Sequence, residues 1–292
     1  IIFTCLIVGY GVVKGIGRSV SFLMPIFFIF IILIAIYSSL IGDIDSTLFF
    51  LFNPNFSALT PQVIISAMGQ AFFSLSIGMG AIMAYGAYIP ENQLIGKTVL
   101  SIILLDTFVA LIAGIAIFPI VFNNSDLMIN AGPSLIFETL PVAFYSLPFG
   151  NIFSVLFFIL LSIAALSSSI SLLEPFTAWM EEKVKTERRI IVCILGLLIW
   201  IIGLGSIFSF NIWAEIKLFG LNFLEGLDYL TNNIMLPMGG FLVALLTGWI
   251  LPKRFLEENL NINKSLFKIF FFCLRYISIG AIVLIFLYSA FL

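Results

Sequence analysis

The sequence predicts an all-α polytopic membrane protein, and two observations support that prediction. Hydrophobic residues make up 62% of the 292 residues, charged residues make up only 10%, and the mean hydropathy is +1.21. Soluble domains carry about 25% charged residues, so a soluble globular protein is excluded. The apolar residues also gather in segments of about 20 residues, the length of a helix that crosses a bilayer.

The predicted helices follow one another along the whole chain. All but one of the 13 lysines and arginines lie in or beside alternate connections between them, the exception being Lys217. Lysine and arginine concentrate in cytoplasmic loops, which predicts a multi-pass protein of the cell membrane. We expect spanning helices at about 20–41, 63–89, 98–122, 150–180, 190–209, 229–251 and 270–292, and the end of another at 1–10. We expect cytoplasmic connections at 11–19, 90–97, 181–189 and 252–269.

The first residue, Ile1, lies inside an apolar segment, and the charged region and cleavage site of a signal peptide are both missing. We therefore expect residues 1–292 to be the C-terminal part of a longer protein and to form a single transmembrane domain. The longest outer connection, about 123–149, contains GPSLIFETLP, which is too short to span the bilayer. We expect this connection to form a re-entrant or helical outer lid.

The segment 63–89 carries residues that a spanning helix normally avoids. Its stretch GQAFFSLSIGMGAIMAYGAY, residues 69–88, contains Ser74, Ser76, Gly78 and Gly80. Glycine is a poor helix former, and serine competes for backbone hydrogen bonds. In hydrocarbon each freed backbone group is costly unless protein, water or an ion meets it. The pattern therefore predicts a helix that is broken at a functional position.

Polar residues inside two later segments offer further oxygen atoms. Asp106 has no basic residue nearby in sequence, so it would either take up a proton and bond to a neighbouring helix or pair with a cation. The segment 150–180 holds a serine cluster at Ser167, Ser168, Ser169 and Ser171, just after Ala164 and Ala165. Each serine alone could bond to its own helix or simply allow close packing. Together they predict a close-packed face that also offers oxygen ligands.

The composition argues against catalysis and nucleic-acid binding. Histidine is absent, and the three cysteines Cys5, Cys193 and Cys273 show no CxxC or CxxH spacing. We expect neither an enzyme nor a nucleic-acid partner. Carbonyl, hydroxyl and carboxylate oxygens are instead the ligands that hard monovalent cations require. The residues therefore predict a cation-coupled carrier for a small anionic or zwitterionic solute.

Three stretches resemble the neurotransmitter:sodium symporter family. GQAFFSLSIGMGAIMAYGAY is similar to the family's unwound sixth helix, LSSSISLLEP to its eighth, and KGIGRSVSFLMP to the start of its fifth. The resemblance implies the LeuT-like inverted-repeat transporter fold, incomplete here, from the end of the fourth helix through the eleventh. It also implies sodium-coupled symport of a small L-amino acid, and the composition points to a bacterial member. The implied partners are the amino acid, the lipid bilayer and the missing N-terminal helices of the same protein.

The resemblance implies two sodium sites and an amino-acid pocket. The first sodium site would include Ser74 and Asp106, and the second would include Ala164, Ser167 and Ser168. The pocket wall would include Phe73, Ser76, Met79, Ser168 and Leu172. Its apolar members imply a hydrophobic or aromatic substrate, although they could also serve only to pack against neighbouring helices. Asp106 and Ala110 depart from the pattern of chloride-dependent relatives, so chloride is not expected.

The resemblance also implies gates and a second unwinding point. Asp228 matches an outer gate, and Glu182 and Tyr88 match a cytoplasmic gate, although Glu182 lies in a mixed charge run that usually forms a solvated loop. Gly15 and Pro25 match a pair that unwinds the helix 20–41, and a simple kink would explain them equally well.

A competing reading is a non-transporting membrane protein, either a degenerate fragment or a helix-packing scaffold. The ligand chemistry favours a carrier, because Ser74, Asp106, Ser167 and Ser168 all remain compatible with ion binding. On the resemblance, each sodium site draws ligands from a helix before Ile1. Residues 1–292 are therefore expected to be inactive alone.

Overall fold

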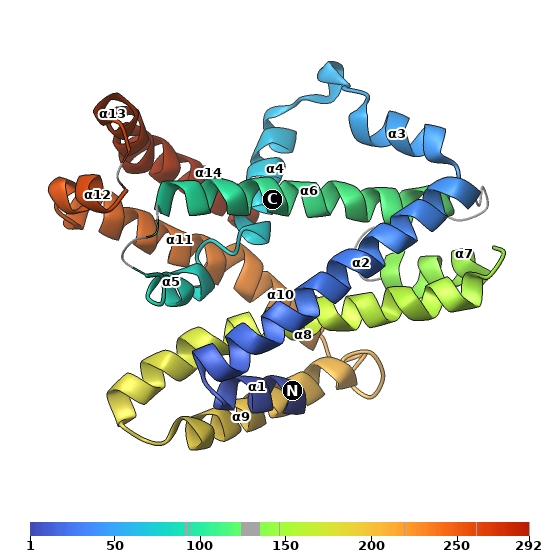
Figure 1. Cartoon of the computed structure of the whole chain (residues 1–292), viewed down its shortest axis with the longest axis horizontal. Coiled ribbons are helices and arrows are strands. Elements are labelled where there is room, and N and C mark those ends of the chain that lie inside the picture. The colour runs from blue at the N-terminus through green and yellow to red at the C-terminus, as the bar shows by residue number, and fades with distance from the viewer. Residues whose placement is uncertain are drawn as a thin grey trace. The chain divides into compact units, whose positions relative to one another are not determined.

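A computed structural model of the chain is helical throughout the residues it describes, which are 1–90, 93, 95–123, 135–145, 147–218, 220–260 and 262–291 (Figure 1). Within these ranges the only β-type pairing is a single antiparallel bridge between Leu218 and Leu221. The predicted all-α class is therefore confirmed.

The helices have the following bounds. Those in the first half of the chain are α1 (Ile2–Gly9), α2 (Arg18–Ile41), α3 (Ile44–Phe52), α4 (Pro61–Ser74), α5 (Ala81–Gly86), α6 (Ile95–Phe122) and α7 (Leu140–Tyr145). Those in the second half are α8 (Gly150–Val184), α9 (Arg188–Phe208), α10 (Phe223–Tyr229), α11 (Leu236–Leu245), α12 (Lys253–Leu260), α13 (Lys264–Phe272) and α14 (Ile279–Phe291). The π-helical turns are η1 (Val12–Gly17), η3 (Leu135–Thr139), η4 (Leu230–Met235), η5 (Leu246–Ile250) and η6 (Cys273–Ser278), and η2 (Phe56–Ala58) is a 3₁₀ turn.

Six of the described helical stretches are long and apolar enough to cross a membrane. They are Val12–Ile41, Ile95–Phe122, Gly150–Val184, Arg188–Phe208, Phe223–Ile250 and Lys264–Leu287. Large apolar side chains such as Phe22, Leu104 and Trp200 are exposed on them, as expected for helices that face lipid. The multi-pass membrane architecture predicted from composition is confirmed. The remaining expected span, 63–89, is present as two separate helices.

Several connections differ from the sequence expectation. Residues 11–19 are largely helical, because η1 runs directly into α2, and residues 252–269 contain α12 and the start of α13. Polar residues had indicated loops there, but they also occupy helix ends, as where the Asn263 side chain accepts from the Ser265 amide at the start of α13. In the expected outer lid, residues 124–134 and 146 lie outside the described residues. Its described part includes the helical segment Leu135–Tyr145.

The chain forms two compact units. The first unit comprises Ile1–Cys5, Ser57–Ile103 and Ser171–Leu292, and the second unit comprises Leu6–Phe56 and Leu104–Ile170. The core of the second unit joins α2, α6, α7 and the first part of α8 through buried residues such as Ile34, Ile120 and Phe144. Tyr37 secures this core, because its ring stacks 3.5 Å from that of Phe153 and its hydroxyl donates to the Pro148 carbonyl at 2.5 Å.

The turn between α2 and α3 in the second unit depends on Gly42 and Asp43. A Cβ on Gly42 would overlap the Pro119 carbonyl of α6, so only glycine fits there. The Asp43 amide donates to that carbonyl at 2.9 Å, while its side chain caps α3 by accepting from the Ser46 hydroxyl and amide. These bonds from Ser46 lower the pKa of the Asp43 carboxyl.

The first unit has a separate apolar cluster. Phe72 from α4 packs there with Leu236 and Ala244 of the α11 region and with Ile282 of α14. This cluster matters for the site because it fixes the C-terminal end of α4, where the helix stops.

Candidate functional site

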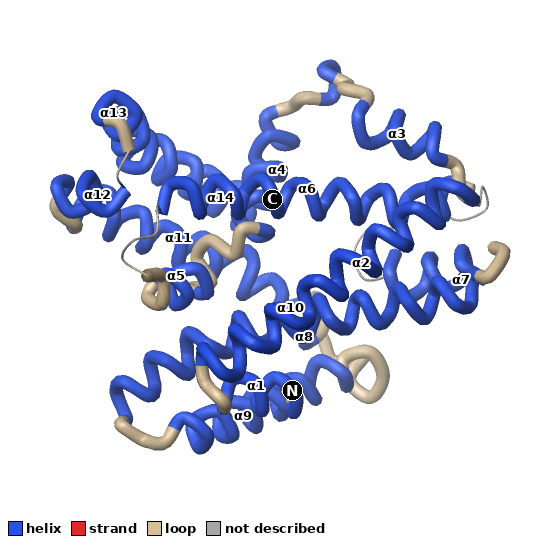
Figure 2. The backbone as a smooth tube through the Cα atoms, in the orientation of Figure 1, coloured by secondary structure: helices blue, strands red, loops and turns tan. Residues whose placement is uncertain are grey.

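The predicted helix break is present between α4 and α5. Helix α4 ends at Ser74 and helix α5 begins at Ala81, with turns between them (Figure 2). Gly78 and Gly80 have φ of 93° and 80°, and Ser76 has φ of 54°. Positive φ is easy for glycine and rare for other residues, so these glycines permit the turn and Ser76 carries backbone strain.

Local hydrogen bonds close the end of α4 in an irregular pattern. The Ser76 amide donates to the Phe73 carbonyl at 2.9 Å, and the Ile77 amide donates to the Phe72 carbonyl at 3.1 Å. Regular i to i−4 pairing is therefore lost after Leu75, whose amide still reaches the Ala71 carbonyl at 3.2 Å. Ser74 is the last residue of α4, where the negative end of the helix dipole favours a cation.

The backbone of helix α11 packs closely against this break. A Cβ on Gly78 would overlap the Leu236 carbonyl oxygen, and a Cβ on Gly239 would overlap the Gly78 carbonyl oxygen. A Cβ on Gly240 would overlap the Phe72 ring. The adjacent glycines of α11 thus let two backbones meet where the membrane helix is interrupted, which is a typical use of small residues between membrane helices.

The expected pocket residues fall in both units. Phe73, Ser76, Met79 and Leu172 belong to the first unit, and Ser168 belongs to the second. Phe73 and Leu172 are 45% and 48% exposed, whereas Met79 packs against the cluster around Phe72. Met79 therefore has the contact that a purely packing role would give it.

The serine cluster lies on α8, where several hydroxyls bond to their own helix. The Ser167 hydroxyl donates to the Ala164 carbonyl at 2.8 Å, and the Ser169 hydroxyl donates to the Leu166 carbonyl at 2.8 Å. Two of the three expected ligands of the second sodium site, Ala164 and Ser167, are therefore in direct contact. Both oxygens keep lone pairs after this bond, so they can still bind a cation. The bond also satisfies the Ser167 hydroxyl proton when no cation is bound.

The expected first sodium site divides between the units. Asp106 lies on α6 in the second unit, and Ser74 lies in the first. The pairing of Asp106 with Ser74 therefore remains a prediction.

A buried ionic network lies where α5, α8 and α9 meet in the first unit. Glu174 of α8 is fully buried and pairs with the Arg188 guanidinium at the start of α9. Arg188 also contacts the Glu181 carboxylate at 3.0 Å, and the Tyr88 hydroxyl donates to Glu174 Oε1 at 3.3 Å. One turn away on α8, the Ser171 hydroxyl accepts from the Tyr85 hydroxyl at 2.9 Å. The network thus ties the segment after the break to two other helices.

The expected gate residues have simpler surroundings. Glu182 is exposed, and Tyr88, which was also expected in the cytoplasmic gate, donates to Glu174. Asp228, expected at the outer gate, is exposed on α10 and accepts from the Asn232 side chain at 2.7 Å.

The expected unwinding pair lies in continuous helical structure. Pro25 is inside α2, and Gly15 is inside η1, where a Cβ would overlap the Ile7 carbonyl oxygen. The immediate reason for glycine at position 15 is this close approach. The proposed unwinding remains a prediction.

Sequence reasoning missed Glu174 and Arg188 as members of a site. Glu174 lies in LSSSISLLEP, inside the predicted span 150–180. Intramembrane ionisable residues are usually functional, and this rule, which singled out Asp106, also applies to Glu174. Arg188 was counted only as one of the basic residues that indicate orientation. Its pairing over fourteen residues depends on how α8 and α9 fold back on each other.

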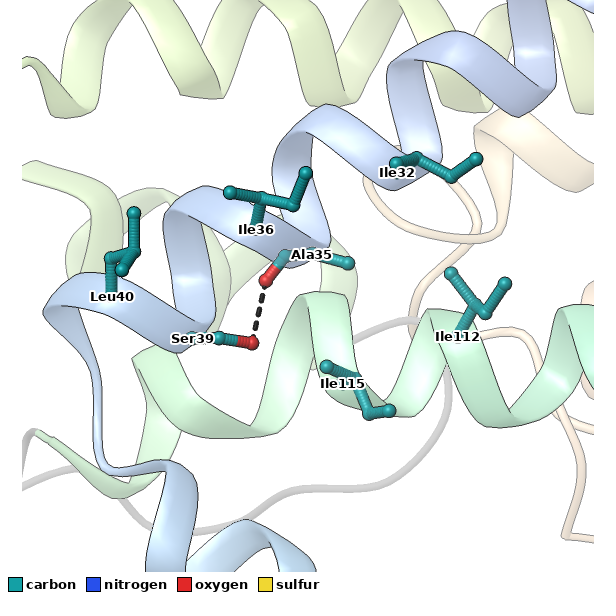
Figure 3. Close-up of a pocket in the computed structure, with 7 residues that line it drawn as sticks. All are labelled: Ile32, Ala35, Ile36, Ser39, Leu40, Ile112 and Ile115. Atoms are coloured by element: carbon teal, nitrogen blue, oxygen red, sulfur yellow. Dashed lines mark hydrogen bonds between the residues drawn. The ribbon is translucent and has the colours of Figure 1, made fainter.

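The second unit also has an apolar groove that contains none of the expected site residues. It is an apolar surface depression of about 340 Å³ between α2 and α6 of the second unit, lined by Ile32, Ala35, Ile36, Ser39, Leu40, Ile112 and Ile115 (Figure 3). Its polar side chain, Ser39, bonds internally to the Ala35 carbonyl at 2.7 Å. A groove of this character suits a lipid acyl chain and offers nothing to hold a polar solute.

Comparisons with known proteins point in one direction. The chain matches the model of the sodium:neurotransmitter symporter family over residues 1–292. It is 35% identical to the uncharacterized sodium-dependent transporter YhdH of Bacillus subtilis, over 97% of this chain and 64% of that protein. It is 33% identical to an uncharacterized sodium-dependent transporter of Haemophilus influenzae, over 100% of this chain and 64% of that protein.

Its structure is also similar to a solved one. The crystal structure of MhsT in complex with L-phenylalanine matches with a TM-score of 0.88 and 40% identity, covering 99% of this chain and 66% of MhsT. The chain thus spans slightly less than two thirds of the length of each of these three proteins.

Proposed function

Because the chain belongs to the sodium:neurotransmitter symporter family, we propose that its protein couples sodium entry to the uptake of a small L-amino acid by alternating access. The observation that carries this proposal is the break between α4 and α5. A membrane helix that ends at Ser74 and restarts at Ala81 places two helix termini within one apolar segment, and the dipole ends of helix termini attract charged groups. Family members use such breaks to bind substrate and ions at the midplane.

The substrate class follows from the side chains at and near the break. Phe73, Met79 and Leu172 are apolar, and methionine adapts to differently shaped partners. A relative at 40% identity was crystallised with L-phenylalanine. The proposed substrates are therefore hydrophobic or aromatic L-amino acids, with Ser76 and Ser168 completing the pocket.

Two sodium ions accompany the substrate in this proposal. The first is bound by Ser74 and Asp106, and the second by the Ala164 carbonyl with the Ser167 and Ser168 hydroxyls. Sodium ions close together in a low-dielectric site repel each other strongly, and the Asp106 carboxylate offsets that repulsion. Transport therefore needs no chloride.

The network around Glu174 closes the cytoplasmic side. Arg188 and Tyr88 hold the segment after the break against α8 and α9 while this network is intact. Opening toward the cytoplasm requires that the buried pair separate. Exposed Glu182 acts at the periphery of this cytoplasmic gate. Asp228 acts in the outer gate, on the opposite side of the membrane.

The proposal is tested by uptake into proteoliposomes that contain the full-length protein. An inward sodium gradient should drive accumulation of L-phenylalanine, leucine and tryptophan should compete better than glutamate or lysine, and replacing chloride by gluconate should leave the rate unchanged. Absence of sodium-driven uptake would refute the function, and a large loss in gluconate would refute the role of Asp106.

A matched pair of serine variants tests the second sodium site. Ser167→Ala removes a proposed ligand, whereas Ser162→Ala removes a hydroxyl of the same helix that only bonds to the Phe158 carbonyl at 2.7 Å. We expect Ser167→Ala to raise the sodium concentration for half-maximal uptake about tenfold, equivalent to about 1.4 kcal/mol, and Ser162→Ala to leave it unchanged. Equal effects of the two variants would contradict the assignment.

A further inference from the structure

The first unit also contains a cation within an apolar helical stretch, and the proposed transport site does not include it. Arg275 is in η6, inside the apolar stretch Lys264–Leu287 that is long enough to cross the membrane. Among the described residues, Arg275 belongs to none of the ion pairs. The Arg275 Nε atom is buried and has no hydrogen-bond partner in the described part of the chain. A charged side chain inside an apolar stretch is costly unless water, a lipid headgroup or another polar group meets it.

Aromatic rings hold the Arg275 guanidinium in place. Its Cζ lies 4.0 Å from the centre of the Trp249 ring, 5.8 Å from that of Tyr276 and 6.0 Å from that of Phe271. The Trp249 indole N–H donates to the Arg275 carbonyl at 3.3 Å, which links η5 to η6. The N–H bonds of a guanidinium lie in its plane, so the contact of Arg275 with the Trp249 ring does not use its N–H donors.

Lys253 brings a second cation to the same aromatic group. Its ammonium lies 5.3 Å from the centre of the Phe271 ring and 5.8 Å from that of Phe267. Phe271 therefore lies near both Lys253 and Arg275. Cation–π contacts orient these cations but do not neutralise them.

The residue types place this pair at the edge of the bilayer. Tryptophan and tyrosine concentrate at membrane interfaces, and Trp249 and Tyr276 contact each other edge to face with ring centres 6.1 Å apart. Lys253 begins α12, just after the apolar stretch Phe223–Ile250 ends. The connection 252–269 is rich in lysine and arginine, which indicates that it faces the cytoplasm. Lipid headgroups on that side are commonly anionic.

We propose that Arg275 and Lys253 together bind the phosphate of an anionic phospholipid in the cytoplasmic leaflet. The two terminal N–H₂ groups of the guanidinium bind the phosphate oxygens in a bidentate manner, and Lys253 adds a point charge. Trp249 and Phe271 pack against the glycerol and the upper acyl chains. The site would tie η5 to η6, and it is independent of the proposed transport site.

Lipid binding to the purified full-length protein in detergent tests this proposal. Titration with dioleoyl phosphatidylglycerol and dioleoyl phosphatidylcholine, followed by native mass spectrometry, gives the preference for the anionic lipid. We expect a preference of about tenfold, the effect of one charge-assisted interaction of ordinary strength. Arg275→Gln and Lys253→Gln should abolish or strongly reduce it. Arg254→Gln is the matched control, because Arg254 is exposed and pairs with Glu258 at 2.7 Å.

The outcomes are decisive even if one variant folds poorly. Arg275→Lys keeps the charge but loses the bidentate geometry, so it should retain less than about a third of the preference. An unchanged preference in Arg275→Gln or in Arg275→Lys would overturn the proposal. Inorganic phosphate at millimolar concentration should not displace the lipid, and full displacement would show a phosphate site instead of a lipid site. Loss of the preference in Arg254→Gln alone would also overturn it, because the lipid would then bind elsewhere.

Discussion

Replacing Glu174 by glutamine isolates the contribution of one buried charge. Glutamine keeps an acceptor for the Tyr88 hydroxyl and nearly the same volume, so the main loss is the negative charge beside Arg188. The Glu174 side chain is 0% exposed and that of Arg188 is 14% exposed, so water replaces little of the lost interaction.

The loss of stability in Glu174→Gln depends on the contacts that Arg188 keeps. Removing one partner of a buried ion pair costs about 3–5 kcal/mol. Arg188 keeps its contact with Glu181 at 3.0 Å, but the Glu181 side chain is 44% exposed and therefore compensates only in part. We expect Glu174→Gln to lower stability by about 2–3 kcal/mol, and Arg188→Gln to cost more because it leaves Glu174 buried without a cation.

Thermal unfolding of the detergent-solubilised protein measures this effect. The apparent unfolding temperature of Glu174→Gln should fall by roughly 4–8 °C. Glu182→Gln is the control, because Glu182 is exposed on the same helix and should change the temperature by less than about 1 °C.

A double-mutant cycle then tests the reasoning itself. Removing both Glu174 and Arg188 charges eliminates the uncompensated group, so the double variant should lose less stability than the sum of the single variants. The reasoning is refuted if Glu174→Gln behaves like Glu182→Gln, or if the two single losses simply add.

Three further predictions concern the scaffold. Gly78→Ala should destabilise the protein by about 1–3 kcal/mol or more, because Gly78 has φ of 93° and a Cβ there would overlap α11. Gly280→Ala is the control, because a Cβ there meets open space and should be neutral or slightly stabilising. Thermal unfolding of both variants measures the difference. Tyr37→Phe keeps its ring stack but loses the hydrogen bond to Pro148, so the same assay should show a loss of about 1 kcal/mol, and no loss would contradict that bond. Asp43 has a pKa below its ordinary value, so its contribution is present above about pH 4 and should be lost as the pH falls through its folded pKa. Hydrogen-exchange protection factors at the start of α3, which correct for the intrinsic pH dependence of exchange, should fall there, and Asp43→Asn should remove most of that change.

Much of the fold follows from composition and periodicity. The all-α membrane class, the family resemblance and the LeuT-like fold are all confirmed by the structure and by the match to MhsT. The break at Gly78 was predictable because glycine and serine are unfavourable inside a membrane helix without a purpose. Local chemistry was enough in that case.

Other features depend on contacts distant in sequence and could not be predicted from local patterns. Arg188 pairs with Glu174 only because α8 and α9 fold back on each other, so the charge run after α8 looked like a solvated loop. The close approach of Gly15 to the Ile7 carbonyl could not be predicted either, and the unwinding role of Gly15 stays a prediction. Helix α12 looked like a connection, because polar residues indicate a loop and an interfacial helix equally well.

The close packing of the broken helix against α11 also has a consequence for biosynthesis. Gly78 leaves the ribosome well before Leu236, Gly239 and Gly240, which lie about 160 residues later in the chain. At about 5–20 residues per second, this interval lasts roughly 8–30 s. Throughout it the interrupted segment has reached the membrane without the helix that covers it. Until α11 is made, another part of the chain, lipid or the insertion machinery has to cover the surface of the break that α11 later contacts.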